Sequence, residues 1–335
     1  MDRLSETILN SFPKKRIVIV GDLVADQFLH GTIARVSREA PVFILRHDDT
    51  DTRGGAAANA AVNIASLGSQ PVLVGLTGHD QNGELLLESL RQAGVNCDFV
   101  VSDPSRKTTT KVRVLAGQHY AARQQVIRID YENTAEIEGS VRQRLLSNLE
   151  SAAPNAEAII ISDYNYGVAD RSVHDLASEI ARQRSIPLLI DSRCRLNDFP
   201  NATTATPNQD EVEQLIGRDF TVEQCSALRE QLGFESLLVT CGNQGMLLVQ
   251  ENNEPKRIAA VGSVEPVDVT GAGDTVIAVY ALGLASGLSF IEAAEIANHA
   301  GGIVVMKKGT ASVSPAELFD SIRTNTKLES LESSA

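Results

Sequence analysis

The sequence has no long apolar run. Its longest purely apolar segments, such as 17–20 and 158–161, are far shorter than the roughly 20 residues that a membrane-spanning helix requires. The first residues, MDRLSETILNSFPKKR, are acidic early and contain no continuous apolar stretch before a small-residue cleavage site, which argues against a secretory signal. These absences predict a cytoplasmic protein with no membrane partner.

Closely spaced cysteines are missing and positive charge is in deficit. The four cysteines lie far apart with no Cys-x-x-Cys pair, which argues against a thiolate zinc site or a disulfide framework. The formal net charge is −13, whereas binding to nucleic acid requires a positive field. We therefore expect no nucleic-acid partner. A site for a small phosphorylated ligand would need its own local cations and oriented amides.

The chain does have enough apolar residues, 43%, to bury a sizeable core. Short β-branched runs, such as RIVIVG at 16–21, alternate with helical segments, which is the pattern of βαβ units. We expect an α/β fold with a mostly parallel central sheet flanked by helices. Strands are predicted at 16–21, 71–75, 158–163, 186–191, 237–240 and 246–250. Helices are predicted at 54–68, 81–93, 171–184, 209–216, 225–232, 272–286 and 289–307.

Two segments, 28–47 and 99–130, interrupt this alternation with mixed sequence rich in Thr, Val and Arg. We interpret them as strands of a small second sheet that forms a lid. The sequence contains no internal repeat and no Gly- or Pro-rich linker, so one compact domain at about 12–324 with an inserted lid is favoured over two domains. The polar residues 325–335 are expected to form a frayed tail.

The sharpest chemical signal is DVTGAGD at 268–274, directly before an apolar helix. Gly271 and Gly273 leave backbone N–H groups unobstructed at a helix N-terminus, where the helix dipole favours an anion. Asp274 in the first turn is placed to accept the proton of an attacking hydroxyl, while the amides of Gly271, Ala272 and Gly273 stabilise a transferring phosphoryl group. Taken alone, the motif also fits a tight turn with an acidic helix start.

This motif resembles the C-terminal signature of the ribokinase, or PfkB, family of carbohydrate kinases. Further family elements follow in order: Gly54, Gly55 and Asn59 match a paired-glycine motif, Gly78, Asp80 and Gly83 a G-x-D-x-x-G element, and Asn208 and Glu211 an Asn-x-x-Glu motif. The resemblance covers about 16–323. It implies a ribokinase-like fold and a kinase that uses ATP and Mg²⁺.

Within the family, the stretches GDLVADQF, RVSREAPV, RGGAAANAAVNIASLG and ANHAGGIVVMKKGTASVSP are most similar to D-glycero-β-D-manno-heptose 7-phosphate kinases of bacterial surface-sugar synthesis. That likeness implies phosphorylation of the anomeric hydroxyl of the heptose 7-phosphate. It also implies pairing of two copies through their lids. No segment for nucleotidyl transfer is apparent, so we expect another protein to perform any later activation step.

The resemblance implies roles for individual residues. Sugar hydroxyls would be contacted by Asp22, Asp26, Gly54, Gly55 and Asn59. A sugar phosphate would be held by Lys111, Arg113 and Arg128, although solvated lid strands are the alternative. ATP would be bound by Arg193, Asn208, Thr240, Gly242, Gly245, Asp268, Thr270, Asn298 and Gly309. Asn208 and Glu211 would organise Mg²⁺ largely through water, although a helix cap fits the same pair. A monovalent cation such as K⁺ is a further expectation.

Two stretches depart from the pattern of the heptose kinases. Asp-Pro-Lys becomes Asp191, Ser192 and Arg193, and Asp-Tyr-x-Lys-Gly becomes DYNYG at 163–167, which lacks the lysine. Two alternatives therefore stay open. One is a kinase for another sugar or a nucleoside, of the ribose or fructose type, and it depends on whether the lid cations converge on the substrate. The other is a catalytically weak sugar or nucleotide sensor.

Overall fold

The structure, a computed structural model, describes residues 3–117, 123–133, 135–262 and 265–332. Its largest element is a nine-stranded sheet of order β13-β12-β11-β10-β9-β8-β1-β4-β5, in which only β12 and β13 run antiparallel to their neighbours. The strands are β1 (Arg16–Gly21), β4 (Gln70–Gly78), β5 (Asn96–Asp103), β8 (Ala158–Asp163), β9 (Leu188–Ser192), β10 (Thr204–Ala205), β11 (Ser236–Thr240), β12 (Met246–Gln250) and β13 (Lys256–Ile258).

The apolar runs of the sequence form strands that are buried on both faces. In β1, Ile17 and Ile19 pack into one hydrophobic core, whereas Val18 and Val20 pack into the core on the opposite face. Alternate side chains of a strand point to opposite faces, so a central parallel strand needs an unbroken apolar sequence. This requirement explains why RIVIVG contains no alternating polar residue.

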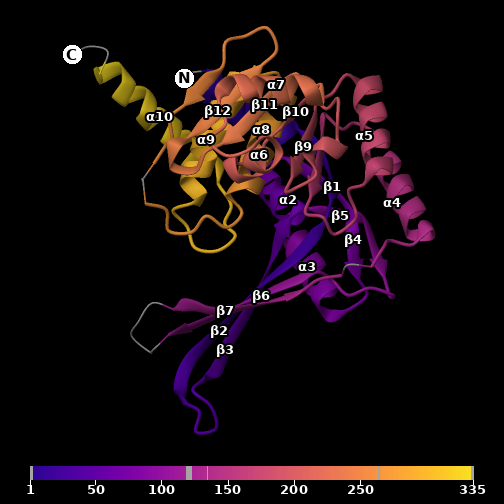
Figure 1. Cartoon of the computed structure of the whole chain (residues 1–335), viewed down its shortest axis with the longest axis vertical. Helices are drawn as coiled ribbons and strands as arrows, with labels where there is room; N and C mark the ends of the chain where they lie inside the picture. Colours follow the sequence, from indigo (N-terminus) through magenta and orange to yellow (C-terminus); the bar gives the residue numbers. More distant parts are fainter. Residues whose placement is uncertain (1–2, 118–122, 134, 263–264, 333–335) are drawn as a thin grey trace.

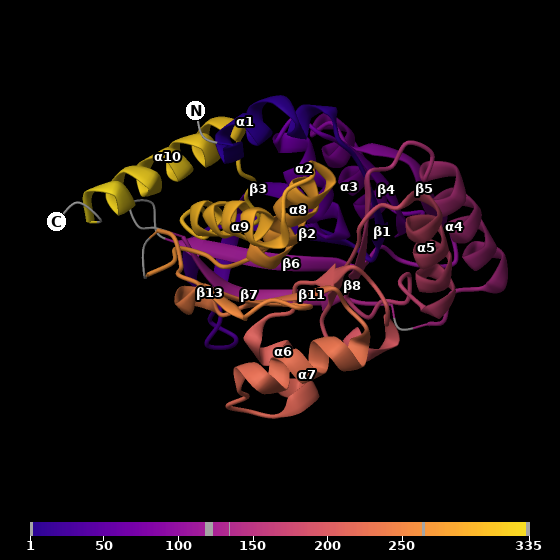
Figure 2. The ribbon, with the colours of Figure 1, turned by 90° about the horizontal axis from the view of Figure 1, so that it is seen from above.

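Helices cover both faces of the central sheet (Figure 2). The first core is closed by α1 (Arg3–Asn10), α2 (Ala57–Ser66), α3 (Gln81–Gln92), α8 (Ala272–Ala285), α9 (Phe290–Val304) and α10 (Pro315–Glu332). The second is closed by α4 (Gly139–Ala152), α5 (Arg171–Arg184), α6 (Gln209–Ile216) and α7 (Val222–Leu232). Among the described residues, no helix is long and apolar enough to cross a membrane.

A second sheet of four strands projects from this body (Figure 1). Its order is β3-β2-β6-β7, and its strands are β2 (Leu23–Val36), β3 (Phe43–Ala56), β6 (Thr110–Gly117) and β7 (Gln124–Tyr131). We call this sheet the lid. Asp22 is the single residue between β1 of the central sheet and β2 of the lid, so the two sheets meet at this residue.

The register of the lid collects the predicted cations on one face. Asp26 lies opposite Lys111, and Arg113 lies opposite Arg128. Residues opposite each other in paired strands share a face, and so do residues two apart along one strand. Lys111, Arg113 and Arg128 therefore share the face of the lid that carries Asp26.

The structure confirms the α/β fold and the small second sheet, with three differences from the sequence prediction. Residues 99–103 belong to β5 of the central sheet, so the second lid segment begins at Thr110. Residues 54–56 complete β3, and the helix predicted from Gly54 begins at Ala57. The segment after 324, predicted as a frayed tail, continues α10 to Glu332.

Candidate active site

Several polar side chains meet at the carboxyl edge of the central sheet. Asp22 follows β1, Tyr164 follows β8, and Asp191 lies near the end of β9. The neighbours of β1 are β8 on one side and β4 on the other, so the chain order reverses here, where α/β proteins form their binding crevices. The N-terminus of α8, with Asp274 in its first turn, closes this crevice.

The carboxylate of Asp274 is buried, with 3% of the residue exposed, and each of its oxygens accepts a hydrogen bond. Asn59 Nδ2 donates to Oδ2 over 2.8 Å, and the Tyr164 hydroxyl donates to Oδ1 over 2.8 Å. Burial raises the pKa of Asp274 to about 6, although these two donors and nearby Arg193 act in the opposite direction. A carboxylate with this pKa is mostly ionised at neutral pH and still basic enough to accept a proton.

The two positions at the α8 N-terminus, Gly271 and Gly273, are occupied by glycine for different physical reasons. Gly271 has φ of +78°, and a Cβ there would lie 2.4 Å from Asn59 Nδ2, so the fold itself requires glycine. Gly273 lies in the helix without a positive φ, and a Cβ there would meet nothing within 4 Å. The open space beside Gly273 leaves room for a ligand at its amide. The Ala272 N–H already donates to Val269 O over 3.2 Å.

A cavity of about 470 Å³ lies beside this helix start. Its apolar wall includes Met246, Val261, Val269, Val276 and Val305. Five residues predicted to bind ATP also line it: Asn208, Thr240, Gly242, Gly245 and Asn298. Gly273, whose amide is predicted to stabilise the transferring phosphoryl group, lines it as well. An apolar slot with a few polar groups and a helix N-terminus at one end fits a flat, anionic ligand.

A second cavity, of about 530 Å³, lies between the lid and the loops around 268 and 309. Four basic side chains line it: Arg53, Arg113, Arg123 and Lys308. Arg53 and Arg113 both lie over the Phe28 ring, at 5.4 and 5.5 Å from its centre. Within the described ranges, the Lys308 ammonium group makes no hydrogen bond or ion pair.

The other two predicted lid cations lie outside this cavity. Lys111 lies over the Tyr166 ring, 5.7 Å from its centre, and Arg128 pairs with Asp130 over 2.8 Å. Arg113 lines the cavity and forms an ion pair with Asp26. A contact of these three cations with one phosphate stays a prediction.

Four residues predicted to bind ATP lie away from the 470 Å³ cavity. Asp268 accepts hydrogen bonds from the N–H groups of Thr270, over 3.0 Å, and Gly309, over 2.8 Å, and these three residues line the second cavity. Arg193 lies over the Tyr164 ring, 4.4 Å from its centre. Their contacts with the nucleotide stay predictions.

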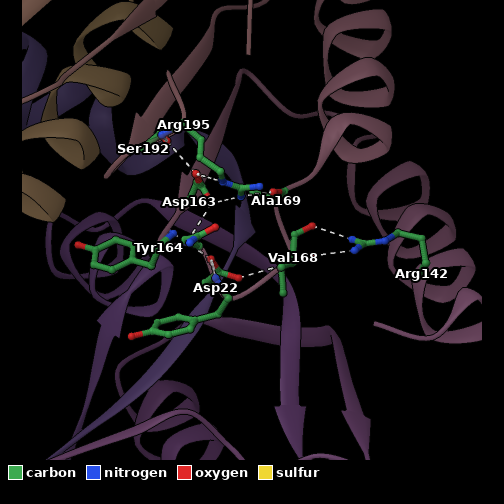
Figure 3. Close-up of polar contacts among 11 residues, drawn as sticks. Asp22, Arg142, Asp163, Tyr164, Val168, Ala169, Ser192 and Arg195 are labelled. Carbon is green, nitrogen blue, oxygen red and sulfur yellow. Dashed lines mark hydrogen bonds and ion pairs between the residues drawn. The ribbon is translucent and has the colours of Figure 1, made fainter. Parts of the chain in front are cut away.

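Asp22 is only 1% exposed, and its carboxylate accepts three backbone N–H groups of the loop after β8 (Figure 3). The donors are Tyr164 and Tyr166 to Oδ2, over 2.8 and 3.0 Å, and Val168 to Oδ1, over 3.0 Å. Its predicted contact with sugar stays untested. The structure shows why both paired positions are glycine. A Cβ on Gly55 would lie 2.6 Å from Asp26 Oδ2, and a Cβ on Gly54 would lie 2.9 Å from the Cβ of Ala58.

The sequence reasoning missed Tyr164 as a partner of Asp274. The available signal was its place in DYNYG, directly after a strand that ends at the predicted site. The same reasoning also missed the ion pair between the buried Asp163 and the half-buried Arg195, beside this loop.

Solved structures of a ribokinase and of a phosphofructokinase share this fold. Arabidopsis thaliana ribokinase in complex with ribose and ATP superposes with a TM-score of 0.69, at 20% identity, over 92% of this chain and 98% of that chain. Escherichia coli phosphofructokinase-2 in complex with potassium gives a TM-score of 0.72, at 19% identity, over 92% and 97%. At this identity the likeness establishes the ribokinase-like fold.

Sequence comparison finds nearer relatives. The bifunctional protein HldE of Vibrio parahaemolyticus is 39% identical over 322 residues, and that of Salmonella dublin is 41% identical over 320 residues. Each alignment covers 94% of this chain and 65% of the relative, so the chain spans less than two thirds of these relatives. The pfkB family carbohydrate kinase model matches residues 14–317. The chain belongs to this family. It is therefore a carbohydrate kinase, as the resemblance of the DVTGAGD motif predicted.

A PfkB kinase implies a divalent metal, and the predicted residues fit Mg²⁺ only as outer ligands. Asn208 and Glu211 form a capping box at the start of α6: Asn208 Oδ1 accepts the Glu211 N–H over 2.9 Å, and Glu211 Oε2 accepts the Asn208 N–H over 2.8 Å. Among the described residues, no group of three or more His, Cys, Asp and Glu is suited to hold a metal. One Glu211 oxygen and water fit an ion that keeps most of its hydration shell.

The open space at Gly273 generates a prediction for ATP binding. Gly273→Ala adds a methyl group beside an anion-binding amide but meets no protein atom, so we expect unchanged stability and about tenfold weaker ATP binding. Isothermal titration and thermal unfolding measure the two quantities. Gly139→Ala is the matched control, because Gly139 also opens a helix, α4, with nothing within 4 Å of its Cβ position. Equal ATP affinity in both variants contradicts this prediction.

Proposed function

We propose that this kinase transfers the γ-phosphoryl group of ATP to the anomeric hydroxyl of D-glycero-β-D-manno-heptose 7-phosphate, with Asp274 as the base. One observation carries the proposal: the segment 268–274 borders both cavities. Ala272 and Gly273 line the apolar cavity, and Asp268 and Thr270 line the cation-lined one. This arrangement supports a nucleotide on one side of Asp274 and an anionic acceptor on the other.

In the proposed reaction, Asp274 accepts the proton of the acceptor hydroxyl as that oxygen attacks the γ-phosphorus in line. The amides at the start of α8, Gly273 among them, stabilise the charge on the transferring group. Arg193, whose charge acts on Asp274, adds a cation at this position. When bound, Mg²⁺ would neutralise charge on the ATP phosphates, with Glu211 holding it through water. A requirement for K⁺ stays a prediction.

The lid is proposed to close over the acceptor. Asp26 lies on the lid face that carries the cations, and Asn59 lies beside Asp274, so both are placed to meet sugar hydroxyls. A closed lid excludes water, which suppresses the transfer of the phosphoryl group to water.

The basic side chains of the second cavity support an acceptor that already carries a phosphate, and three of them, Arg53, Arg113 and Arg123, also pair with aspartates. The protein has a net charge of −13, yet Arg53, Arg113, Arg123 and Lys308 line one space beside Asp268 and Thr270. Guanidinium groups bind phosphate oxygens in a bidentate manner, and a lysine without a partner adds a mobile charge. The relatives named HldE support a heptose phosphate in particular.

Replacing the proposed base tests the mechanism. Asp274→Asn keeps the shape of the side chain but cannot accept the proton, so we expect turnover to fall by about 10²- to 10⁴-fold with ATP binding largely kept. For the unmodified protein, turnover should fall as the pH drops below about 6, because Asp274 must be ionised to act as a base. The measurement is ADP release across heptose 7-phosphates, ribose, fructose and fructose phosphates.

Asp175→Asn, at an exposed carboxylate on α5, is the matched control for this experiment. Full turnover of Asp274→Asn shows that Asp274 is not the base. If only ribose or fructose stimulates ADP release, the acceptor is an unphosphorylated sugar and not the heptose 7-phosphate. ATP binding without turnover on any sugar favours a sensor instead of a kinase for these substrates.

Replacing a lysine of the second cavity with an uncharged residue tests whether this cavity binds the phosphate of the acceptor. Lys308→Met should raise the KM for a heptose 7-phosphate by about tenfold, because one charged contact to the phosphate is lost. It should leave the KM for ATP unchanged. Lys14→Met, near the opposite edge of the sheet, is the control, and an identical acceptor KM in both variants excludes Lys308 from the phosphate site.

We further propose that two copies pair through their lids. Support comes from exposed apolar residues on the lid: Val36, Val42, Phe43, Val126, Ile127, Ile129 and Tyr131. Such side chains are rarely left in water together on a monomer. Sedimentation equilibrium should give about twice the mass of 35.9 kDa, and should give one chain's mass after Ile127→Asp. A single-chain mass for the unmodified protein refutes the pairing.

A further inference from the structure

The orientation of Asp274 depends on a tyrosine that the proposed mechanism does not use. Asn59 and the Tyr164 hydroxyl donate to different oxygens of the carboxylate, each over 2.8 Å. Two donors on two oxygens fix the plane of a carboxylate, because rotation in either direction breaks one bond. Donation to the ionised form also favours that form, which lowers the pKa of the group.

Tyr164 is held in place by its own backbone. Its N–H donates to Asp22 Oδ2 over 2.8 Å, and the same carboxylate accepts the N–H groups of Tyr166 and Val168, each over 3.0 Å. A carboxylate that accepts several backbone N–H groups is rigid and costly to disturb when buried. Asp22 therefore fixes the path of the loop after β8 from the junction between the central sheet and the lid.

A second buried carboxylate holds the same loop from the opposite side (Figure 3). Asp163, which is 0% exposed, accepts the Ser192 hydroxyl over 2.7 Å and Arg195 Nε over 3.2 Å. Arg195 also donates to Ala169 O over 2.8 Å, so it bridges the end of β8 to the end of the loop.

Arg142 of α4 completes this support (Figure 3). Its guanidinium group donates to Val168 O over 2.8 Å and to Gly167 O over 2.7 Å. The loop that carries Tyr164 is thus bonded to Asp22 after β1, to Asp163 at the end of β8, to Arg195 after β9 and to Arg142 of α4, far more than a surface connection requires.

The ring and hydroxyl of Tyr164 are also constrained. The Arg193 guanidinium lies over the ring at 4.4 Å from its centre. Burial, and then the charge of Asp274, raise the pKa of Tyr164 well above its ordinary value. Its hydroxyl therefore stays protonated at neutral pH, where it donates to Asp274.

We propose that Tyr164 is a positioning residue for the reaction: its hydroxyl holds the Asp274 carboxylate ionised and oriented toward the acceptor. Asp22 and Asp163 act through it, by fixing the loop that carries it. This inference rests on the proposed role of Asp274 as the base, and it gives Asp22 a function that requires no contact with the sugar.

The test must separate the effect of Tyr164 on the pKa of Asp274 from the effects of the charged groups around that carboxylate. Asp26 on β2 raises the pKa of Asp274, and Arg193 after β9 lowers it, in addition to the burial and the two hydrogen bonds. Asp191 at the end of β9 also interacts with Asp274, and its own pKa is raised by burial and by that charge. Tyr164→Phe removes one donor and leaves all of these charges in place.

The experiment follows the ¹³Cγ resonance of Asp274 in the full chain labelled at aspartate, assigned by its absence in Asp274→Asn. In Tyr164→Phe we expect the midpoint of its titration to rise by about one pH unit. The low-pH limb of the kcat profile should rise by the same amount, with the acceptor KM nearly unchanged. Tyr166→Phe is the matched control, because the Tyr166 hydroxyl donates to Glu132 Oε1 over 2.7 Å and not to Asp274. It should leave both midpoints in place.

The outcomes are distinct. A rise in both midpoints for Tyr164→Phe alone supports the proposal. An unchanged resonance midpoint, or a kcat profile that does not follow it, overturns it, and so does an equal shift in Tyr166→Phe. Thermal unfolding of both variants separates these results from a loss of structure. Should Asp274→Asn keep full turnover, the proposed base is wrong, and the resonance still decides whether Tyr164 holds that carboxylate.

Discussion

A carboxylate buried in protein is stable in its charged form only where polar partners replace the water that it has lost. Asp274 has two such partners, Asn59 from α2 and Tyr164 from the loop after β8, and its pKa of about 6 reflects the balance between burial and these contacts. The rest of the site follows from this constraint. The glycine at 271 leaves room for Asn59, and the loop of Tyr164 is held by further buried carboxylates.

Acidic and basic side chains occupy different places in the molecule. The protein is strongly acidic, but two of its buried carboxylates have strong partners: Asp22 accepts backbone N–H groups and Asp163 pairs with Arg195. The cavity beside the lid instead gathers basic side chains, and one of them, Lys308, has no partner among the described residues. On an acidic protein, basic side chains gathered at one cavity favour an anionic ligand there.

The sequence predicted the central sheet well, because parallel strands buried on both faces need unbroken β-branched runs such as 16–21 and 158–163. It predicted the α8 N-terminus because the two glycines and Asp274 are adjacent in the chain. The boundary of the lid was less accurate, since the sequence of a strand does not specify its pairing partner, and only that partner decides which sheet β5 and β6 each join.

Sequence patterns alone could not predict contacts between residues that are distant in the chain. Whether Asn208 and Glu211 cap a helix or face a metal depends on atoms that no spacing specifies, and the capping box is what the structure shows. In the same way, Asp22 at a strand end fits a sugar ligand or a loop anchor equally well. Its three backbone donors appear only once 164–168 is placed beside it.

The three side chains that form the centre of the site are far apart in the chain, with Asn59 and Tyr164 lying 215 and 110 residues before Asp274. A ribosome synthesises them in that order. A nascent chain that has reached only residue 250 has its lid and most of its central sheet, but neither the carboxylate nor the helix N-terminus next to it. In the proposed mechanism, such a chain cannot transfer the phosphoryl group of ATP until α8 has been synthesised.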